Sequence, residues 1–167
     1  MSESGPHHTL GELFEQALGM EQKAAEVYGE LTKLFSHVPE ISHFWAELSM
    51  DEIQHKRLLE ETYKSLADEQ LSSRLERSIW RSVVAVQDYL DKDLIGPIKN
   101  LDDAYEIAHQ LEFYEINTIF KFLANEVVPN NDRRGLLLST LQEHQDKLMN
   151  FNENFGDRAW RRGIASR

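Results

Sequence analysis

Glu52 and His55 lie three positions apart in the segment MDEIQHKRLLE, whose apolar residues recur at helical spacing. Side chains at positions i and i+3 of a helix share one face, so the carboxylate and the imidazole point in the same direction. Both groups bind divalent metals. The pair therefore predicts part of a metal site, provided that other acids converge on it, because a motif this short also arises by chance.

Three other acids fall within apolar stripes elsewhere in the chain, namely Glu21, Glu112 and Glu115. Burying an ionised carboxylate in an apolar interior is costly unless the group is paired, protonated or bound to a cation. A divalent metal pair would supply that compensation directly. The candidate metal ligands are therefore Glu21, Glu52, His55, Glu112 and Glu115.

Each of these acids also has a simpler explanation. Glu21 could form an ion pair with Lys23 or Lys56 on the surface of its helix. Glu112 and Glu115 would face solvent if their helix were rotated. Coincidence of all the acids with the apolar faces of their helices favours the metal site, since independent surface residues would not show it.

The elements that position these residues are predicted to be helices. Apolar residues recur about every 3.6 positions over long stretches, which four prolines and eight glycines interrupt. Apolar and polar residues do not alternate over any sustained stretch. Thr9 is a predicted N-cap, with Glu12 three positions later. The predicted helices cover residues 9 to about 35, a segment starting near residue 41, and residues 69–94, 101–127 and 132–152. The fold class is all-α.

Composition narrows the possible partners and location. The chain has 167 residues, which predicts a single domain over 1–167 with a core at about 9–152 and a tail at 153–167. Its net charge of -11 argues against nucleic acid and membrane surfaces as partners. No apolar run is long enough to span a membrane or to act as a secretion signal, so we expect a cytoplasmic protein. Cysteine is absent, so oxygen and imidazole must hold any metal.

An internal repeat relates the two halves of the chain. The segments LGELFEQALGMEQ and LDDAYEIAHQLEF superpose Glu21 on Glu112. The segments LSMDEIQHKRLL and LSTLQEHQDKLM place Gln142 and Gln145 at the positions of Glu52 and His55. The repeat therefore predicts that two helix pairs face each other across one interior.

The last predicted helix lacks an obvious second Glu-x-x-His. Its leucine face directs Gln145 inward, puts Gln142 and His144 at the margins, and turns Glu143 and Asp146 away. No ligand is assigned on this helix. Because Gln is a neutral and weaker donor than Glu, the second metal position is predicted to be poorly occupied.

The order Glu21-x-x-Ala24-x-x-x-Tyr28, then Glu52-x-x-His55, then Glu112-x-x-Glu115 resembles the ferritin-like domain of the rubrerythrin family over roughly residues 9–152. The resemblance implies a ferritin-like four-helix bundle with a long helical crossover between core helices 2 and 3, into which residues 69–94 fit. It also implies a di-iron centre at the five candidate ligands, with no catalytic residue beyond them, and assembly into homodimers or larger homo-oligomers. Complete rubrerythrins carry a rubredoxin module with four cysteines, so an external electron donor is expected here.

Three functions remain open from the sequence. The first is a non-haem oxidoreductase of peroxidase or ferroxidase type, which reduces peroxide or oxygen with electrons from a separate donor. The second is an iron-binding or iron-handling module without turnover, and the third is a structural bundle with a degraded metal site. Iron is the expected metal, with manganese and zinc as alternatives, because all three accept carboxylate and imidazole ligands.

Overall fold

The computed structural model describes residues 6–113, 115–129 and 131–155, apart from the side chains of residues 115, 116 and 152. The helices are α1 (Leu10–Leu34), α2 (Pro39–Ser65), α3 (Asp68–Leu71), α4 (Arg77–Leu90), α5 (Leu101–Phe113), α6 (Glu115–Phe122), the π-helical turn η1 (Leu123–Val127), α7 (Asp132–Met149) and α8 (Phe151–Phe155). Within these residues no strand forms, so the all-α prediction is confirmed.

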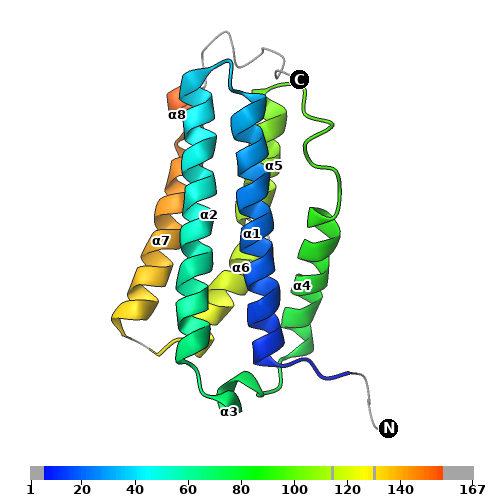
Figure 1. The fold of residues 1–167 in the computed structure, drawn as a ribbon, viewed down its shortest axis with the longest axis vertical. Helices are drawn as coiled ribbons and strands as arrows, with labels where there is room; N and C mark the ends of the chain where they lie inside the picture. The colour runs from blue at the N-terminus through cyan, green and yellow to red at the C-terminus, as the bar shows by residue number, and fades with distance from the viewer. Residues whose placement is uncertain (1–5, 114, 130, 156–167) are drawn as a thin grey trace.

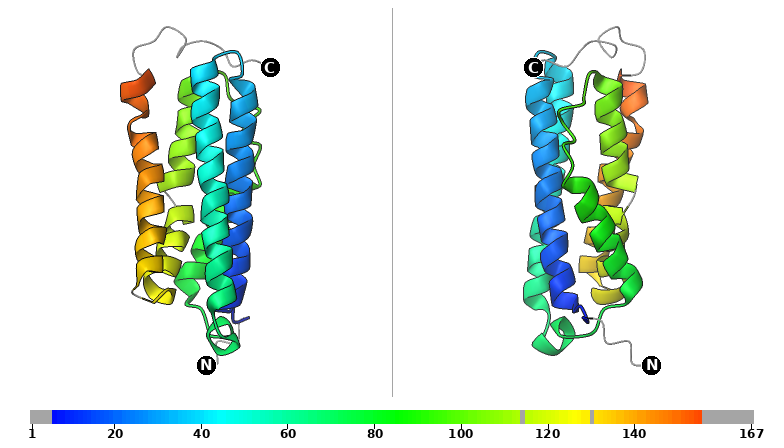
Figure 2. Two further views of the ribbon diagram at one scale, coloured as in Figure 1. Left: turned by 60° about the vertical axis from the view of Figure 1, so that its left-hand side comes forward. Right: turned by 90° about the vertical axis from the view of Figure 1, so that its right-hand side faces the viewer.

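The long helices pack side by side as a bundle (Figure 1). Helix α1 runs from the lower to the upper end of the view and α2 returns beside it. A crossover through α3 and α4 then takes the chain back to the upper end, where α5 starts. Helices α5 and α6 descend, and α7 rises against α2 and α5 (Figure 2). This is the ferritin-like arrangement, with one long connection between the second and third core helices.

Local sequence signals explain where the first two helices begin. Thr9 Oγ1 accepts a hydrogen bond from the Glu12 backbone amide at 3.2 Å, and Glu12 Oε2 accepts one from the Thr9 amide at 2.7 Å. This reciprocal capping box confirms the predicted N-cap. Pro39 occupies the first turn of α2, where its missing amide hydrogen removes no helical hydrogen bond. The second helix therefore starts slightly earlier than predicted.

The crossover differs from the prediction of one helix over 69–94. Helix α3 ends at Leu71 and α4 covers only Arg77–Leu90. Between them, Ser73 O accepts a hydrogen bond from the Leu10 amide at 3.0 Å, and the Leu75 amide donates to His8 O at 2.8 Å. This long-range pairing holds the segment extended, so it cannot continue a helix.

The remaining predicted helices are found with modified ends. The predicted helix over 101–127 corresponds to α5, α6 and the π-helical turn η1 that follows α6. Residue 114, between α5 and α6, lies outside the described residues. The helix predicted over 132–152 is α7 followed by the short α8. In the predicted tail, Phe155 is buried and packs on Phe44, whereas residues 156–167 lie outside the description.

No helix in the described part of the chain has the length and apolar character needed to cross a membrane. The single-domain assignment over 1–167 stays a prediction.

Candidate metal centre

Four core helices each direct polar side chains into the interior of the bundle. Glu21 comes from α1, Glu52 and His55 from α2, Glu112 from α5, and His144 from α7. Each of these residues is at most 3% exposed, although apolar side chains fill the rest of the interior. Such a concentration of buried ionisable groups requires mutual pairing or a bound cation.

The first donor group consists of Glu21, Glu52 and His55. Nδ1 of His55 lies 3.0 Å from Glu52 Oε2 and 3.7 Å from Glu21 Oε2. Glu21 Oε2 is buried and has no hydrogen-bond partner among the described residues. An orphaned carboxylate oxygen beside a second carboxylate and an imidazole is the donor chemistry that a divalent cation satisfies.

The second donor group consists of Glu52, Glu112 and His144. Nε2 of His144 lies 3.0 Å from Glu52 Oε1 and 2.6 Å from Glu112 Oε1. Glu52 belongs to both groups, with Oε2 facing His55 and Oε1 facing His144. Its carboxylate therefore stands where it could bridge two ions.

His144 corrects the sequence analysis, which placed this residue at the margin of its helix and assigned it no role. The side chain is fully buried, whereas Gln142 is exposed and Gln145 is 8% exposed. Gln145 does point inward as predicted, but its amide nitrogen contacts the backbone oxygen of Glu112, 3.4 Å away. The His144 imidazole, three residues after Leu141, is therefore the counterpart of His55 on α7, a position at which the repeat had aligned Gln145.

Leu141 occupies the position where a Glu would complete a second Glu-x-x-His motif. It lies three residues before His144, on the same face of α7, and is 2% exposed. Bundles that hold two metals use a Glu-x-x-His from each of two helices. Among the side chains that the structure describes, one carboxylate fewer therefore stands beside His144 than in such a bundle.

Replacing Leu141 with Glu is expected to raise the affinity for the second ion by about tenfold or more, because it adds a charged oxygen ligand. Without metal the same variant should unfold at a lower temperature, since the new carboxylate is buried without a partner. Titration with Zn²⁺ and thermal unfolding with and without Zn²⁺ measure both effects. Leu136→Glu is the matched control, because Leu136 is 51% exposed on the same helix. A Leu141→Glu variant indistinguishable from this control would remove Leu141 from the site.

Groups around the donors fix their orientation. The Tyr28 hydroxyl donates a hydrogen bond of 2.5 Å to Glu112 Oε1. Asp51 Oδ2 lies 3.1 Å from His144 Nδ1 and 2.7 Å from Lys147 Nζ. Burial opposes ionisation of Asp51, but His144 and Lys147 lower its pKa. An ionised Asp51 accepts the proton of His144 Nδ1, which leaves Nε2 free to bind a metal.

Asp51→Asn is expected to weaken binding of the ion beside His144 by about 10- to 100-fold, the range found when a partner of a metal-binding histidine is removed. The ion beside His55 should keep its affinity, because Asp51 does not contact that histidine. Competition titrations that resolve two binding steps measure the difference. Asp88→Asn, an exposed change of the same chemistry on α4, serves as the control. Equal weakening of both steps would indicate a general loss of structure.

Without metal, the buried carboxylates and histidines of the centre differ in how their surroundings shift the pKa. Burial raises the pKa of Glu21 strongly, and burial with the neighbouring Glu52 raises the pKa of Glu112 to about 7. Burial also opposes the charge of Glu52, yet the attraction of His144 keeps its pKa well below the usual range. The carboxylates overcome the burial of His55 and raise its pKa to about 10, and the pKa of His144 is raised likewise, with Glu112 as the main attractive partner. The surroundings therefore favour an ionised Glu52 among neighbours that keep their protons.

Metal affinity is expected to rise with pH between about 6 and 8. The raised pKa values mean that the free centre holds protons at neutral pH, and metal ligands must be deprotonated. Each proton released makes the apparent affinity increase about tenfold per pH unit. Calorimetric titration with Zn²⁺ in two buffers of different ionisation enthalpy counts the protons. An affinity independent of pH across this interval would contradict the arrangement.

Comparison with known proteins places the fold in a family. The rubrerythrin family model matches residues 12–134. The chain belongs to the rubrerythrin family. No curated protein and no solved structure matches it. The matched span contains Glu21, Glu52, His55 and Glu112, and it stops before the part of α7 that carries Leu141 and His144.

The donor set of this rubrerythrin-family chain fits a di-metal site. Two groups of three buried ligands share one carboxylate, and the donors are the oxygen and imidazole types expected without cysteine. Glu115 was the fifth ligand predicted from the sequence. Its side chain lies outside the description, so its participation stays a prediction.

Proposed function

We propose that this protein is a di-iron carboxylate oxidoreductase that reduces peroxide or oxygen with electrons from a separate donor. The observation that supports the proposal best is Glu52, whose two oxygens face two different histidine-containing donor groups. When bound, a pair of ferrous ions supplies two electrons to an oxidant. Membership of the rubrerythrin family favours iron over manganese and zinc.

The protein residues would hold, orient and shield this centre. Glu21 and His55 would hold one ion, Glu112 and His144 the other, and Glu52 both. Tyr28 keeps its proton, because burial and the nearby Glu112 raise its pKa well above the usual value of a tyrosine, and its hydroxyl donates a hydrogen bond to one oxygen of Glu112. The surrounding apolar side chains limit access of water and so suppress side reactions.

The electron donor and the oligomeric state belong to the proposal as well. These 167 residues contain no cysteine, so they provide no thiolate-bound iron that could reduce the centre. Electrons must reach it from a group outside these residues. A homodimer or larger homo-oligomer in the cytoplasm is the expected form.

Anaerobic loading with ferrous ion followed by a limiting pulse of hydrogen peroxide tests the reaction. Reducing one peroxide to two waters takes two electrons and two protons, so two ferrous ions should be lost per peroxide. A chelator assay for remaining ferrous ion measures the ratio, with iron in buffer at equal concentration as the reference. Loss of ferrous ion no faster than in buffer, with iron still bound, would overturn the redox proposal.

Iron binding without turnover is the second candidate, and Leu141 is the observation that favours it. A centre with one carboxylate fewer near His144 would hold its second ion weakly, and the two-electron step requires both ions. The peroxide experiment distinguishes the candidates, because a binding module retains iron and leaves peroxide unconsumed. The Leu141→Glu variant sharpens the test, since restoring the ligand should then switch peroxide consumption on.

A further inference from the structure

A row of aromatic side chains leads from the metal centre toward the surface at the upper end of the bundle. Its inner end is Tyr28 on α1, whose hydroxyl donates the 2.5 Å hydrogen bond to Glu112 Oε1. The Tyr28 ring lies almost parallel to the indole ring of Trp45 on α2, with a centroid distance of 6.1 Å and an angle of 9° between the planes. Both side chains are fully buried. The row therefore starts in direct contact with a candidate metal ligand.

Two further rings continue the row from Trp45. The centroid of Phe151 on α8 lies 6.0 Å from that of Trp45, and the centroid of Tyr105 on α5 lies 4.8 Å from that of Phe151. Phe151 is fully buried and Tyr105 is half-buried, so Tyr105 is where the row meets solvent. Figure 1 shows α8 and the start of α5 at the same end of the bundle. Three oxidisable side chains, Tyr28, Trp45 and Tyr105, thus connect the centre with the surface.

The indole N–H of Trp45 is buried and has no hydrogen-bond partner among the described residues. Buried tryptophans usually pair this group, because an unpaired donor costs free energy. Packing alone therefore does not explain an indole at this position, since an apolar ring would fill space without burying a donor. Without a proton acceptor, however, the indole gives up and regains an electron while keeping its proton. Trp45 is thus suited to relay electrons between two tyrosines.

The proposed reaction creates a need for such a relay. Reduction of peroxide takes two electrons, and one ferrous ion supplies only one. The ion beside His144 is expected to be weakly held, because Leu141 stands where a bundle of this kind has a carboxylate. In a chain that holds a single ion, the second electron must come from the protein. Tyr28 is an oxidisable side chain that already contacts the donor set.

We propose that Tyr28, Trp45 and Tyr105 carry single electrons from the external donor to the metal centre. The inference rests on the function proposed above. With one ferrous ion bound, reduction of one hydrogen peroxide to two waters takes one electron from the ion, one electron and one proton from Tyr28, and one proton from solvent. Tyr28 is left as a neutral phenoxyl radical.

The row then restores Tyr28 from the surface inward. Trp45 gives one electron to the Tyr28 radical, which takes one proton from solvent and regains its hydroxyl. Tyr105 reduces the Trp45 radical cation and releases its phenolic proton to solvent. The donor returns one electron to Tyr105, which takes a proton back. One electron and one net proton are thus consumed, and all three side chains end as they began.

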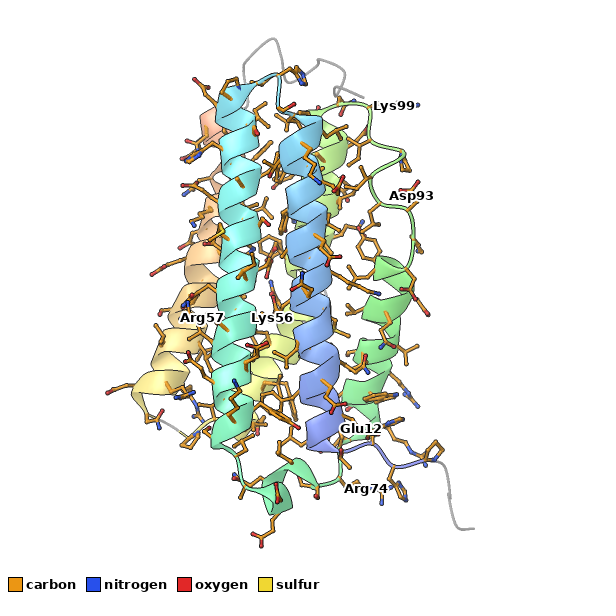
Figure 3. All side chains as sticks on the ribbon, viewed as in Figure 1. Glu12, Lys56, Arg57, Arg74, Asp93 and Lys99 are labelled. Atoms are coloured by element: carbon orange, nitrogen blue, oxygen red, sulfur yellow. The ribbon has the colours of Figure 1, made fainter. Side chains whose placement is uncertain are left out.

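Flash oxidation of the metal-free chain of 167 residues tests the path without iron. Because the chain contains no cysteine, Lys99→Cys adds one thiol at an exposed position just before α5, which Figure 3 labels at the upper end of the molecule. A ruthenium polypyridyl complex attached to this thiol is excited by a laser flash, with a cobalt(III) ammine as the electron acceptor. The oxidised ruthenium then withdraws one electron from the protein.

The path predicts that the resulting radical reaches Tyr28. Its contribution is identified by EPR spectroscopy as the tyrosyl signal that Tyr28→Phe removes. This signal should be lost in Trp45→Phe and retained in Trp80→Phe, since Trp80 lies on α4 toward the opposite end of the bundle. It should also be lost in Tyr105→Phe and retained in Tyr89→Phe, which replaces another half-buried tyrosine.

The path and the proposed function fail separately in these experiments. The path is overturned if the Tyr28 signal is absent from the labelled protein or persists in Trp45→Phe, even if the iron-loaded protein consumes peroxide. A Tyr28 signal that requires Trp45 supports the path, even if bound iron is not oxidised.

The role of Tyr28 at the centre has its own readout. In protein loaded with one ferrous ion per chain, freezing shortly after a peroxide pulse should trap the same radical signal. Tyr28→Phe should lose this signal, whereas Tyr63→Phe, a change at a half-buried position on α2, should keep it. Metal content is measured in each variant, so that yields are compared per bound ion. Equal radical yields in the two variants would overturn this role.

Discussion

Replacing Glu52 with Gln is expected to abolish binding of both metal ions. The carboxylate contributes Oε2 to the group around His55 and Oε1 to the group around His144, so one substitution removes a charged ligand from each ion. A neutral amide cannot bridge two cations with comparable strength. Metal content after loading, measured by elemental analysis, should fall from one firmly held ion and a more weakly held second ion per chain to nearly none.

Glu61→Gln is the matched control for this experiment. Glu61 lies on the same helix and is exposed. The Glu61→Gln substitution therefore makes the same chemical change away from the metal centre. Protein stability provides a second readout, because bound metal raises the unfolding temperature of the wild type by mass action. That increase should disappear in Glu52→Gln and persist in Glu61→Gln. A Glu52→Gln protein that still binds two ions would show that Glu52 is not shared.

Replacing His144 with Ala is expected to remove one ion and spare the other. His144 contacts Glu52 and Glu112, whereas the group formed by Glu21, Glu52 and His55 does not include it. The affinity of the second step should fall by more than about 100-fold, which exceeds the usual effect of removing an outer partner. A titration that resolves two binding steps should therefore show one step unchanged and one missing.

The Gln145→Ala variant tests whether the structure or the internal repeat identifies the correct counterpart of His55 on α7. The repeat pairs Gln145, rather than His144, with His55, and the sequence assigns no ligand on this helix. The structure instead gives Gln145 only a contact with the backbone of Glu112. Gln145→Ala should therefore keep both binding steps. Loss of the second step in Gln145→Ala, with retention in His144→Ala, would reverse the assignment on α7.

The acids on the first three core helices could be predicted because each interrupts an apolar stripe. Glu21, Glu52 and Glu112 are separated from apolar neighbours by three or four residues, which places them on the buried face whatever the exact ends of the helix. An error of one or two residues in a predicted helix end does not change which face of the helix the central residues occupy. Their common burial in the structure follows from this geometry.

His144 was missed because alignment of a weak repeat can slip by one residue. One residue corresponds to about 100° of rotation around a helix, enough to exchange a buried position with a neighbouring one. A signal was present, since Leu137, Leu141, His144 and Leu148 follow the spacing of a single helical stripe. Gln145 belongs to the same broad stripe, so periodicity alone could not decide which side chain reaches Glu112.

The crossover could not be predicted from local patterns. Residues 69–94 have helical periodicity, but Ser73 and Leu75 pair with the segment around His8, more than sixty positions earlier. Backbone hydrogen bonds between distant segments leave no periodic trace in either segment.

Anomalous diffraction from crystals soaked anaerobically with ferrous ion, recorded at the iron absorption edge, tests the metal centre most directly. Two peaks are expected inside the bundle, one among Glu21, Glu52 and His55 and the other among Glu52, Glu112 and His144, with lower occupancy at the second. Peaks confined to the surface, with none between α1, α2, α5 and α7, would contradict this arrangement.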